Sequence, residues 1–378
     1  MSNAQGAVAS VHTEVCAQPP EFTDDVLHLP KGLELSLGGR LPAVDLAWRM
    51  TGPAGAPVIA VLGGISAHRR VCAASADETA WWPGLVGPGL GVDTDRFRVL
   101  SFDYLGGSGG STGPAVRTDA DAASGTDEIG SRIASFPSVT TSDQTALLAL
   151  LLDHLGIQRL HAFVGASYGG MVALAFAAEH GSRLGRLLVV SAAEEAHPLA
   201  TAWRSIQRRI VRLGLQNGSG SEGLSLARGL AMTTYRSPAE FAQRFASTPT
   251  VTEQGFRFPV EEYLDARGAD FAAQVLPESF LCLSESIDLQ HINPHDVHVP
   301  TTLIAVRQDQ LVPVEQMRAL AARLGPGDSS GSGDRSYSGR GVGNRLIEID
   351  SLFGHDAFLK EDEILIPLFK QALEGKQS

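Results

Sequence analysis

A serine set between glycines carries the chemistry that this sequence suggests most directly. Gly165, Ser167 and Gly169 belong to a Gly-x-Ser-x-Gly pentapeptide, which follows the apolar segment 159–164 and precedes the alanine-rich helical pattern 171–178. A strand, a tight turn and a helix in this order form a nucleophile elbow, which lifts one hydroxyl above a sheet. Glycines flank the serine there because larger side chains would collide with the strand and the helix. The pattern predicts a nucleophilic Ser167, and the alternative is an ordinary glycine-rich turn.

A serine hydroxyl of ordinary acidity is a weak nucleophile, so the elbow requires a histidine base and a carboxylate. After this kind of elbow the two follow in the chain order carboxylate, then histidine. Asp309 comes just after the buried-strand pattern 301–306, and open α/β sheets place their chemistry at the carboxyl ends of strands. His355 follows another strand pattern, 345–350, and is expected in a loop. We expect Ser167, Asp309 and His355 to form a catalytic triad.

Attack on an acyl group also needs N–H donors for the oxyanion that develops. The continuous apolar segment 57–62 ends in a loop of small residues that begins at Gly63. Folds with this elbow build half of the oxyanion hole at such a loop and the other half from the residue after the nucleophile, here Tyr168. Backbone N–H groups near Gly63 and at Tyr168 are therefore predicted to form the oxyanion hole.

The bulk composition is that of a globular enzyme. The 378 residues are 43% hydrophobic and 19% charged, which allows a large core. The formal net charge of −12 argues against nucleic acid or an anionic membrane as a partner. Three cysteines without metal-like spacing indicate a reduced, cytoplasmic setting. No secretory signal and no apolar run of membrane-spanning length is evident.

Strand and helix patterns alternate along the chain, which predicts an α/β protein with a mostly parallel sheet. Residues 1–25 are small and polar and are expected to be a flexible tail. The patterns of the core occupy residues 26–195 and 297–378. Between them, residues 196–296 show helical periodicity and little that resembles a buried strand. This insertion is predicted to be a helical lid that covers the serine and excludes water.

Shorter features of the core are predicted from local composition. Residues 115–135 are expected to be a surface excursion, and the Gly/Ser-rich residues 325–344 a disordered loop. Residues 140–155 have a helical pattern, for which Ser142 is the expected N-cap. Residues 105–114 are rich in glycine but lack the Lys-Ser/Thr ending of a phosphate-binding loop.

Longer segments match one enzyme family. The most specific are the Gly-Ser-Thr-Gly-Pro sequence at 110–114 and the His-Asp-Ala-Phe-Leu sequence at 355–359, supported by residues 81–82, 136–143 and 223–228. In these segments the chain resembles the homoserine O-acyltransferase family, an α/β-hydrolase-fold group that acylates the hydroxyl of homoserine from acyl-CoA in methionine biosynthesis. The resemblance implies an α/β-hydrolase fold with an inserted helical lid, and a homodimer formed through the lid helices.

The resemblance implies the same triad and adds residues that bind the acceptor. Arg228 is expected to hold the carboxylate of the amino acid, with Tyr235 alongside, and Asp356 to hold its ammonium group. One fixed cation and one fixed anion orient an α-amino acid. Without the resemblance, Arg228 would be interpreted as a solvated helix arginine and Asp356 as a loop cap.

The acyl donor is predicted from one loop position. Succinyl-CoA users of the family tend to have Arg or Lys where this chain has Gly109, so acetyl-CoA is favoured, unless Arg69, Arg70, Arg208 or Arg209 supplies the charge. We therefore expect a homoserine O-acetyltransferase that works by a ping-pong, acyl-serine mechanism, with acyl-CoA as co-substrate and no bound cofactor or metal. The alternatives are a homoserine or serine O-succinyltransferase, an esterase or thioesterase, and a non-catalytic binding protein.

Overall fold

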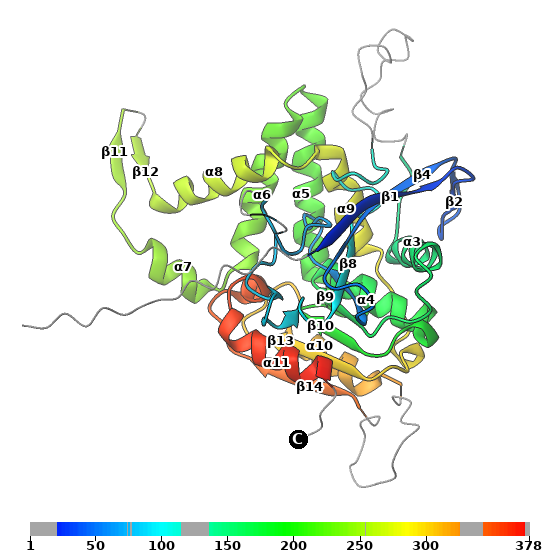
Figure 1. Cartoon of the computed structure of the whole chain (residues 1–378). Helices are drawn as coiled ribbons and strands as arrows, with labels where there is room; N and C mark the ends of the chain where they lie inside the picture. The colour runs from blue at the N-terminus through cyan, green and yellow to red at the C-terminus, as the bar shows by residue number, and fades with distance from the viewer. Residues whose placement is uncertain are drawn as a thin grey trace, which may run out of the picture.

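The computed structural model describes residues 21–73, 75, 78–114, 136–253, 255–325 and 343–374. The main sheet has eight strands (Figure 1). They are β1 (Phe22–Leu29), β4 (Val44–Thr51), β5 (Val58–Leu62), β8 (Arg98–Phe102), β9 (Ala162–Ala166), β10 (Leu187–Val190), β13 (Thr301–Val306) and β14 (Arg345–Ile349). Their spatial order is β1-β4-β8-β5-β9-β10-β13-β14. From β8 to β14 all neighbours pair in parallel, which confirms the predicted α/β class and mostly parallel sheet.

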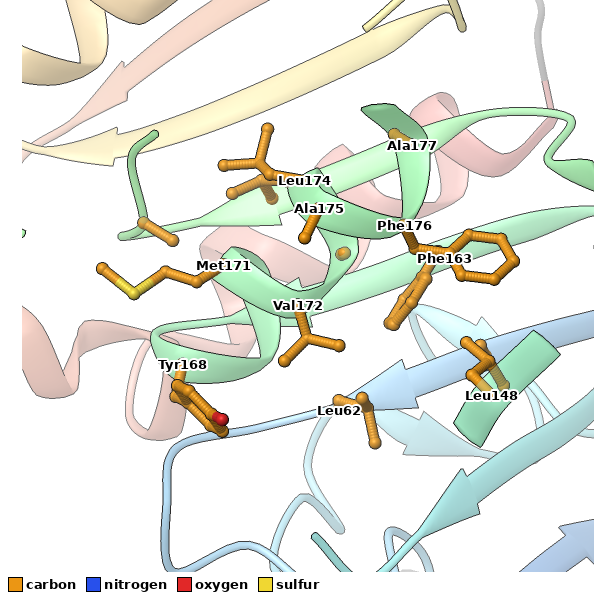
Figure 2. Packing of buried hydrophobic residues seen from close by; sticks show 14 of the residues in the cluster. Leu62, Leu148, Phe163, Tyr168, Met171, Val172, Leu174, Ala175, Phe176 and Ala177 are labelled. Atoms are coloured by element: carbon orange, nitrogen blue, oxygen red, sulfur yellow. The ribbon is translucent and has the colours of Figure 1, made fainter. Parts of the chain in front are cut away.

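The central strands are buried on both faces. Every residue of β9, β10 and β13 is buried, as the continuous apolar sequences of parallel strands require. Successive side chains of β9 point to opposite faces, so that Phe163 joins one apolar cluster while Ala162 and Val164 join another. Figure 2 shows α4 (Tyr168–Glu179) lying over the first cluster, where Val172 and Phe176 face the β9 side chain of Phe163. On the other face, α11 (Asp362–Glu374) contributes Leu365, Phe369 and Leu373.

The N-terminal edge of the sheet differs slightly from the prediction. β1 begins at Phe22, inside the segment that was expected to be a tail, and pairs antiparallel with β4 along its whole length. Between these strands, β2 (Leu33–Glu34) and β3 (Arg40–Leu41) form a short hairpin of their own. Gly38 and Gly39 turn it with φ of 88° and 86°, a region that favours glycine. Residues 86–87 and 92–93 form two further short strands, β6 (Val86–Gly87) and β7 (Val92–Asp93).

The helix predicted at 140–155 is present as α3 (Thr141–His154), but its cap is Thr140 and not Ser142. Thr140 accepts a hydrogen bond from the N–H of Asp143, and the Asp143 carboxylate accepts the N–H of Thr140. This reciprocal pair satisfies two N–H groups at once, which a cap at Ser142 would leave unpaired. Two further elements complete the core: α10 (Val314–Arg323) and the 3₁₀ helix η3 (Gly354–Leu359).

The segment between β10 and β13 contains α5 (Pro198–Gln216), α6 (Gly220–Tyr235), α7 (Pro238–Phe245), α8 (Pro259–Ala272) and α9 (Pro277–Asp288). In Figure 1, α5, α6, α8 and α9 gather above the sheet, and we call α5 to α9 the lid helices. Four of them begin with proline, which suits the first turn of a helix because no N–H is needed there. They have a small apolar cluster of their own that includes Val211, Leu224 and Phe280.

One element of this segment was not predicted. β11 (Thr250–Thr252) and β12 (Gly255–Arg257) form an antiparallel hairpin beyond α7. All of its strand residues are exposed, so it has none of the apolar alternation by which a half-buried strand is recognised.

Several predictions fall outside the described residues. These are the tail up to residue 20, the surface excursion at 115–135 and most of the loop at 325–344. Within the described part of the chain, no helix has both the length and the apolar character that crossing a bilayer would take.

Candidate active site

Ser167 lies in a strained turn between β9 and α4. Its backbone has φ of 55° and ψ of −125°, which is unusual for a residue other than glycine. The flanking glycines are required by space, because a Cβ on Gly165 would lie 2.3 Å from the carbonyl oxygen of Gly169. A Cβ on Gly169 would lie 2.3 Å from the backbone of Leu62. The predicted elbow is therefore present, with its strain held by backbone packing on both sides.

The structure brings the three predicted triad residues together. Ser167 Oγ lies 2.8 Å from His355 Nε2, and His355 Nδ1 lies 2.7 Å from Asp309 Oδ2. The other carboxylate oxygen of Asp309 accepts the N–H groups of Leu311 at 2.8 Å and Val312 at 3.0 Å. Those two bonds fix the Asp309 carboxylate, which in turn orients the imidazole toward the serine.

The electrostatics of His355 suit a general base. Burial disfavours its charged form, but the Asp309 carboxylate outweighs burial, and the pKa of His355 is raised above its ordinary value of 6.5. The His355 side chain is 7% exposed, so its proton can pass to few groups other than the serine and the bound substrate. The carboxylate holds the neutral imidazole in position to accept the serine proton, and it stabilises the imidazolium ion that then forms.

The position of His355 depends on the glycine before it. Gly354 has φ of 54°, and a Cβ there would lie 2.9 Å from the carbonyl oxygen of Tyr235. The end of α6 and the start of η3 therefore touch at backbone level. Tyr235, which was predicted to lie beside the acceptor, has its ring centre 5.8 Å from that of His355.

Two N–H groups are available for an oxyanion. The carbonyl oxygen of Gly63 accepts hydrogen bonds from the N–H of Gly169 at 2.7 Å and the hydroxyl of Tyr104 at 2.6 Å. The N–H of Gly63 is therefore the backbone group left to bind a ligand. Neither this N–H nor that of Tyr168, the first residue of α4, has an acceptor among the residues that the structure describes. Tyr168 lines the cavity at Ser167, whereas the loop after β5 contributes Gly64 and Ile65 and not Gly63, so the oxyanion hole at these two N–H groups stays a prediction.

The triad opens into a cavity of about 170 Å³, lined by Ser167 and His355 and walled by apolar side chains such as Ile287 and Val312. A second, larger cavity of about 610 Å³ adjoins it and shares part of its wall. Arg228 lies on both cavities. An acyl group attached to Ser167 would lie in the smaller cavity.

Arg228 of α6 has the character of an anion-binding side chain. Its guanidinium lies 5.0 Å from the ring centre of Tyr235 and 4.6 Å from that of Phe271. No acidic side chain in the described part of the chain pairs with it, and its buried Nε has no hydrogen-bond partner there. Two aromatic rings hold the cation in place and leave its donors to a ligand.

Asp356 is also on the triad cavity, but it has a partner that the sequence did not reveal. Arg236 Nε lies 2.9 Å from Asp356 Oδ2, and the same guanidinium pairs with Glu240 at 3.5 Å. Asp356 is 8% exposed, so the ion pair supplies a partner for a largely buried carboxylate. An ammonium group would therefore have to bind beside Arg236.

Of the four alternative cations proposed for the donor, Arg69, Arg70 and Arg208 are paired with carboxylates, and Arg209 is exposed on α5. Arg69 donates to Asp103 at 2.5 Å and to Asp24 at 2.6 Å, and Arg70 pairs with Glu78 at 2.9 Å. A Cβ at Gly109 would lie 2.5 Å from the Asp103 carboxylate, so a longer residue there would displace Asp103.

The sequence interpretation missed Arg204. This residue of α5 lines the triad cavity, and it shares the carboxylate of Asp288 on α9 with Arg208. The signal that was available is the spacing of four between Arg204 and Arg208, which places them on one face of a helix. Their common acidic partner lies 80 residues or more further along the chain, where no local pattern points to it.

No group of three or more His, Cys, Asp or Glu side chains in the described residues is arranged to hold a metal ion.

Comparison with known proteins agrees with the geometry. Residues 57–329 match the family described as alpha/beta hydrolase fold. The chain is 41% identical to the homoserine O-succinyltransferase of Xanthomonas campestris pv. campestris, over 87% of this chain and 78% of that protein. It is 33% identical to the homoserine O-acetyltransferase of Clavibacter michiganensis, over 88% of each chain. It is 31% identical to the serine O-succinyltransferase of Litchfieldella anticariensis, over 92% of this chain and 97% of that one.

Solved structures show the same fold at low identity. The homoserine O-acetyltransferase from Bacillus anthracis aligns with a TM-score of 0.80 at 20% identity, over 94% of this chain and 99% of that one. Esterase E22 aligns with a TM-score of 0.78 at 20% identity, over 93% of this chain and 100% of that one.

Proposed function

This chain belongs to the homoserine O-acyltransferase family of α/β hydrolases, and from that premise we propose that it transfers an acyl group from acyl-CoA to the hydroxyl of L-homoserine. The observation that carries the proposal is Arg228, a cation without an acidic partner among the described residues, on the same cavity as the triad. Esterases share this fold, and hydrolysis needs no such cation beside the serine. Binding an acceptor that carries a carboxylate does need a cation there.

The first half-reaction would load the serine. Ser167 Oγ attacks the thioester carbonyl while His355, oriented by Asp309, takes the hydroxyl proton. The N–H groups of Gly63 and Tyr168 stabilise the oxyanion. The carbon–sulfur bond then breaks, and the departing thiolate takes the proton from His355 and leaves as the free thiol of coenzyme A.

The second half-reaction would unload it. Arg228 holds the carboxylate of homoserine, and Asp356 with Tyr235 lies on the same cavity to hold its amino end. His355 takes the proton of the homoserine hydroxyl, whose oxygen attacks the acyl-serine carbonyl. The ester of homoserine forms, the bond to Ser167 Oγ breaks, and His355 returns the proton to the serine. Water is the competing acceptor, and the lid helices limit its access.

Thiol release with and without homoserine tests the proposal. We expect purified protein to release thiol from acyl-CoA at a rate that rises with homoserine concentration and saturates. Serine differs from homoserine by one methylene, which is worth about 10- to 200-fold in discrimination, so it serves as the matched poor acceptor. Thiol release that is unaffected by either amino acid would assign the protein to the thioesterases.

The donor is a separate question. Acetyl-CoA was favoured because Gly109 carries no charge, yet any longer residue at that position would require the Asp103 side chain to move. A succinyl donor is the second candidate, and the identity of 41% to a homoserine O-succinyltransferase favours it. The acyl group that this site accepts depends on the cations that do line the triad cavity.

A further inference from the structure

Arg204 gives the triad cavity a second cation. It lies on α5 and lines the same cavity as Ser167 and Arg228. Its side chain is 12% exposed and that of its partner Asp288 is 10% exposed, so both are largely removed from solvent. A charge that is largely shielded from water interacts strongly with a charged group that enters the cavity.

The charges around Arg204 do not cancel. Arg204 Nε donates to Asp288 Oδ1 at 2.8 Å, and Arg208 Nη1 donates to Asp288 Oδ2 at 2.6 Å, so two guanidinium groups share one carboxylate. Burial favours the neutral form of Asp288, but the two arginines and Thr201 outweigh it, and the pKa of Asp288 is lowered. The cluster therefore keeps a net charge of about +1 at neutral pH.

The two arginines are not equivalent. Nη1 of Arg208 donates to the carbonyl oxygen of Ser284 at 2.9 Å as well as to Asp288. Arg204 uses Nε and Nη2 on Asp288, whereas its Nη1 makes no hydrogen bond to any described residue. Arg204 therefore contributes to the contact between α5 and α9 and still has one terminal nitrogen left for a ligand.

The charge of Arg204 reaches the triad. Among the influences on His355, Asp309 raises the pKa of the imidazole while Arg204 lowers it. Two other acidic side chains line the cavity. Asp356 pairs with Arg236, and Glu195 has a side chain that is 57% exposed, so solvent screens its charge from Arg204.

We propose that Arg204 recognises a carboxylate on the acyl group, so that the donor is the coenzyme A thioester of a dicarboxylic acid such as succinate. The inference rests on the proposed function: homoserine brings one carboxylate, which Arg228 holds, and a second cation on the same cavity calls for a second carboxylate. The bonds made and broken are those of the two half-reactions above, since the distal carboxylate takes no part in them. Arg204 is thus a specificity-determining residue on a lid helix.

Three donors separate charge from size. Succinyl-CoA and butyryl-CoA have acyl groups of four carbons, and only succinyl carries a distal carboxylate, while acetyl-CoA is the small neutral donor. With homoserine saturating, we expect the wild type to have a kcat/KM for succinyl-CoA at least about 10-fold above that for butyryl-CoA.

The variants are Arg204→Met, which keeps the methylene stem without the charge, and Arg204→Lys, which keeps the charge. We expect Arg204→Met to lower kcat/KM for succinyl-CoA about 10- to 100-fold and to change the values for acetyl-CoA and butyryl-CoA less than about threefold. Arg204→Lys should restore part of the succinyl preference. Arg209→Met, an exposed arginine on the same helix, is the matched control and should change no donor.

Donor ratios are measured within one protein sample, so partial misfolding of a variant does not affect them. A wild type that uses acetyl-CoA better than succinyl-CoA, or an Arg204→Met variant that slows all three donors equally, would overturn the inference and leave homoserine acylation intact. Failure of every donor to show homoserine-dependent thiol release would instead overturn the proposed function.

Discussion

The sheet and the lid helices hold their parts of the site by different means. On the sheet side, the positions of Ser167 and His355 are fixed by backbone contacts at Gly165, Gly169 and Gly354, where no side chain fits. On the lid side, Arg204 and Arg228 are held by side chains: an ion-pair cluster in one case and two aromatic rings in the other.

The difference indicates which half determines the reaction and which the substrates. A triad built on backbone geometry tolerates little change, because a small displacement of the nucleophile costs much of the rate. Cations held by side chains can be exchanged or moved by single substitutions without disturbing the elbow. We therefore expect changes on the sheet side to abolish chemistry and changes on the lid side to alter substrate preference.

The largest effect is expected at the nucleophile. Ser167→Ala should lower thiol release with every donor by at least about a thousandfold, because the acyl-enzyme can no longer form. The melting temperature should not fall, since alanine adds no atom to the elbow. Intact-protein mass spectrometry after incubation with acyl-CoA should show an adduct on the wild type alone, and an adduct on the variant would place the nucleophile elsewhere.

A smaller and more selective effect is expected on the lid side. Arg228→Met should raise KM for homoserine about 10- to 100-fold through loss of a charge-assisted contact, while slow acyl-CoA hydrolysis without acceptor persists. Steady-state kinetics with homoserine varied measures this split. If hydrolysis falls in parallel with transfer, Arg228 supports the triad and the proposed division between the two halves is wrong.

The pH dependence follows from His355. The neutral imidazole is the base, and Asp309 raises its pKa above 6.5, so kcat/KM should fall about tenfold per pH unit on the acid side of a midpoint above 6.5. The raised pKa also stabilises the fold: this contribution is fully present below about pH 6.5 and is lost as pH rises through the higher folded value. Kinetic titration, with urea unfolding across the same pH range, measures both. A midpoint well below 6.5 would show that burial dominates over Asp309.

The smallest effect is expected far from the site. Thr140→Ala removes the side-chain cap of α3 and should lower the free energy of unfolding by about 1 kcal/mol. The donor and acceptor preferences should stay unchanged, because α3 touches neither cavity. Ser142→Ala is the comparison variant: it removes an exposed hydrogen bond from Ser142 Oγ to Glu179 and should cost less, so an equal or larger loss of stability there would contradict the assignment of Thr140 as the cap.

Sequence reasoning reached the parts of the molecule that follow from local rules. The elbow around Ser167 has a fixed spacing, and the chain order carboxylate then histidine led to Asp309 and His355, which the structure joins by hydrogen bonds. Continuous apolar runs marked the buried strands, because parallel strands are covered on both faces.

It did not reach the pairings between distant polar side chains. Arg236 and Asp356 meet although 120 positions separate them in the chain, and Arg204 meets Asp288 from another lid helix. Such pairs depend on how helices pack, which no local pattern encodes. The β11–β12 hairpin was not predicted because none of its strand residues is buried, so its sequence has no apolar pattern of a strand.

The place of Arg228 on the wall between the two cavities has a kinetic consequence. A homoserine molecule that arrives before the serine is acylated would bind the same guanidinium and occupy space beside Ser167 that the acyl donor needs. Excess acceptor should then slow turnover by competing with the donor. Velocity plotted against homoserine concentration would rise to an optimum and decline, and more acyl-CoA would move that optimum to higher homoserine.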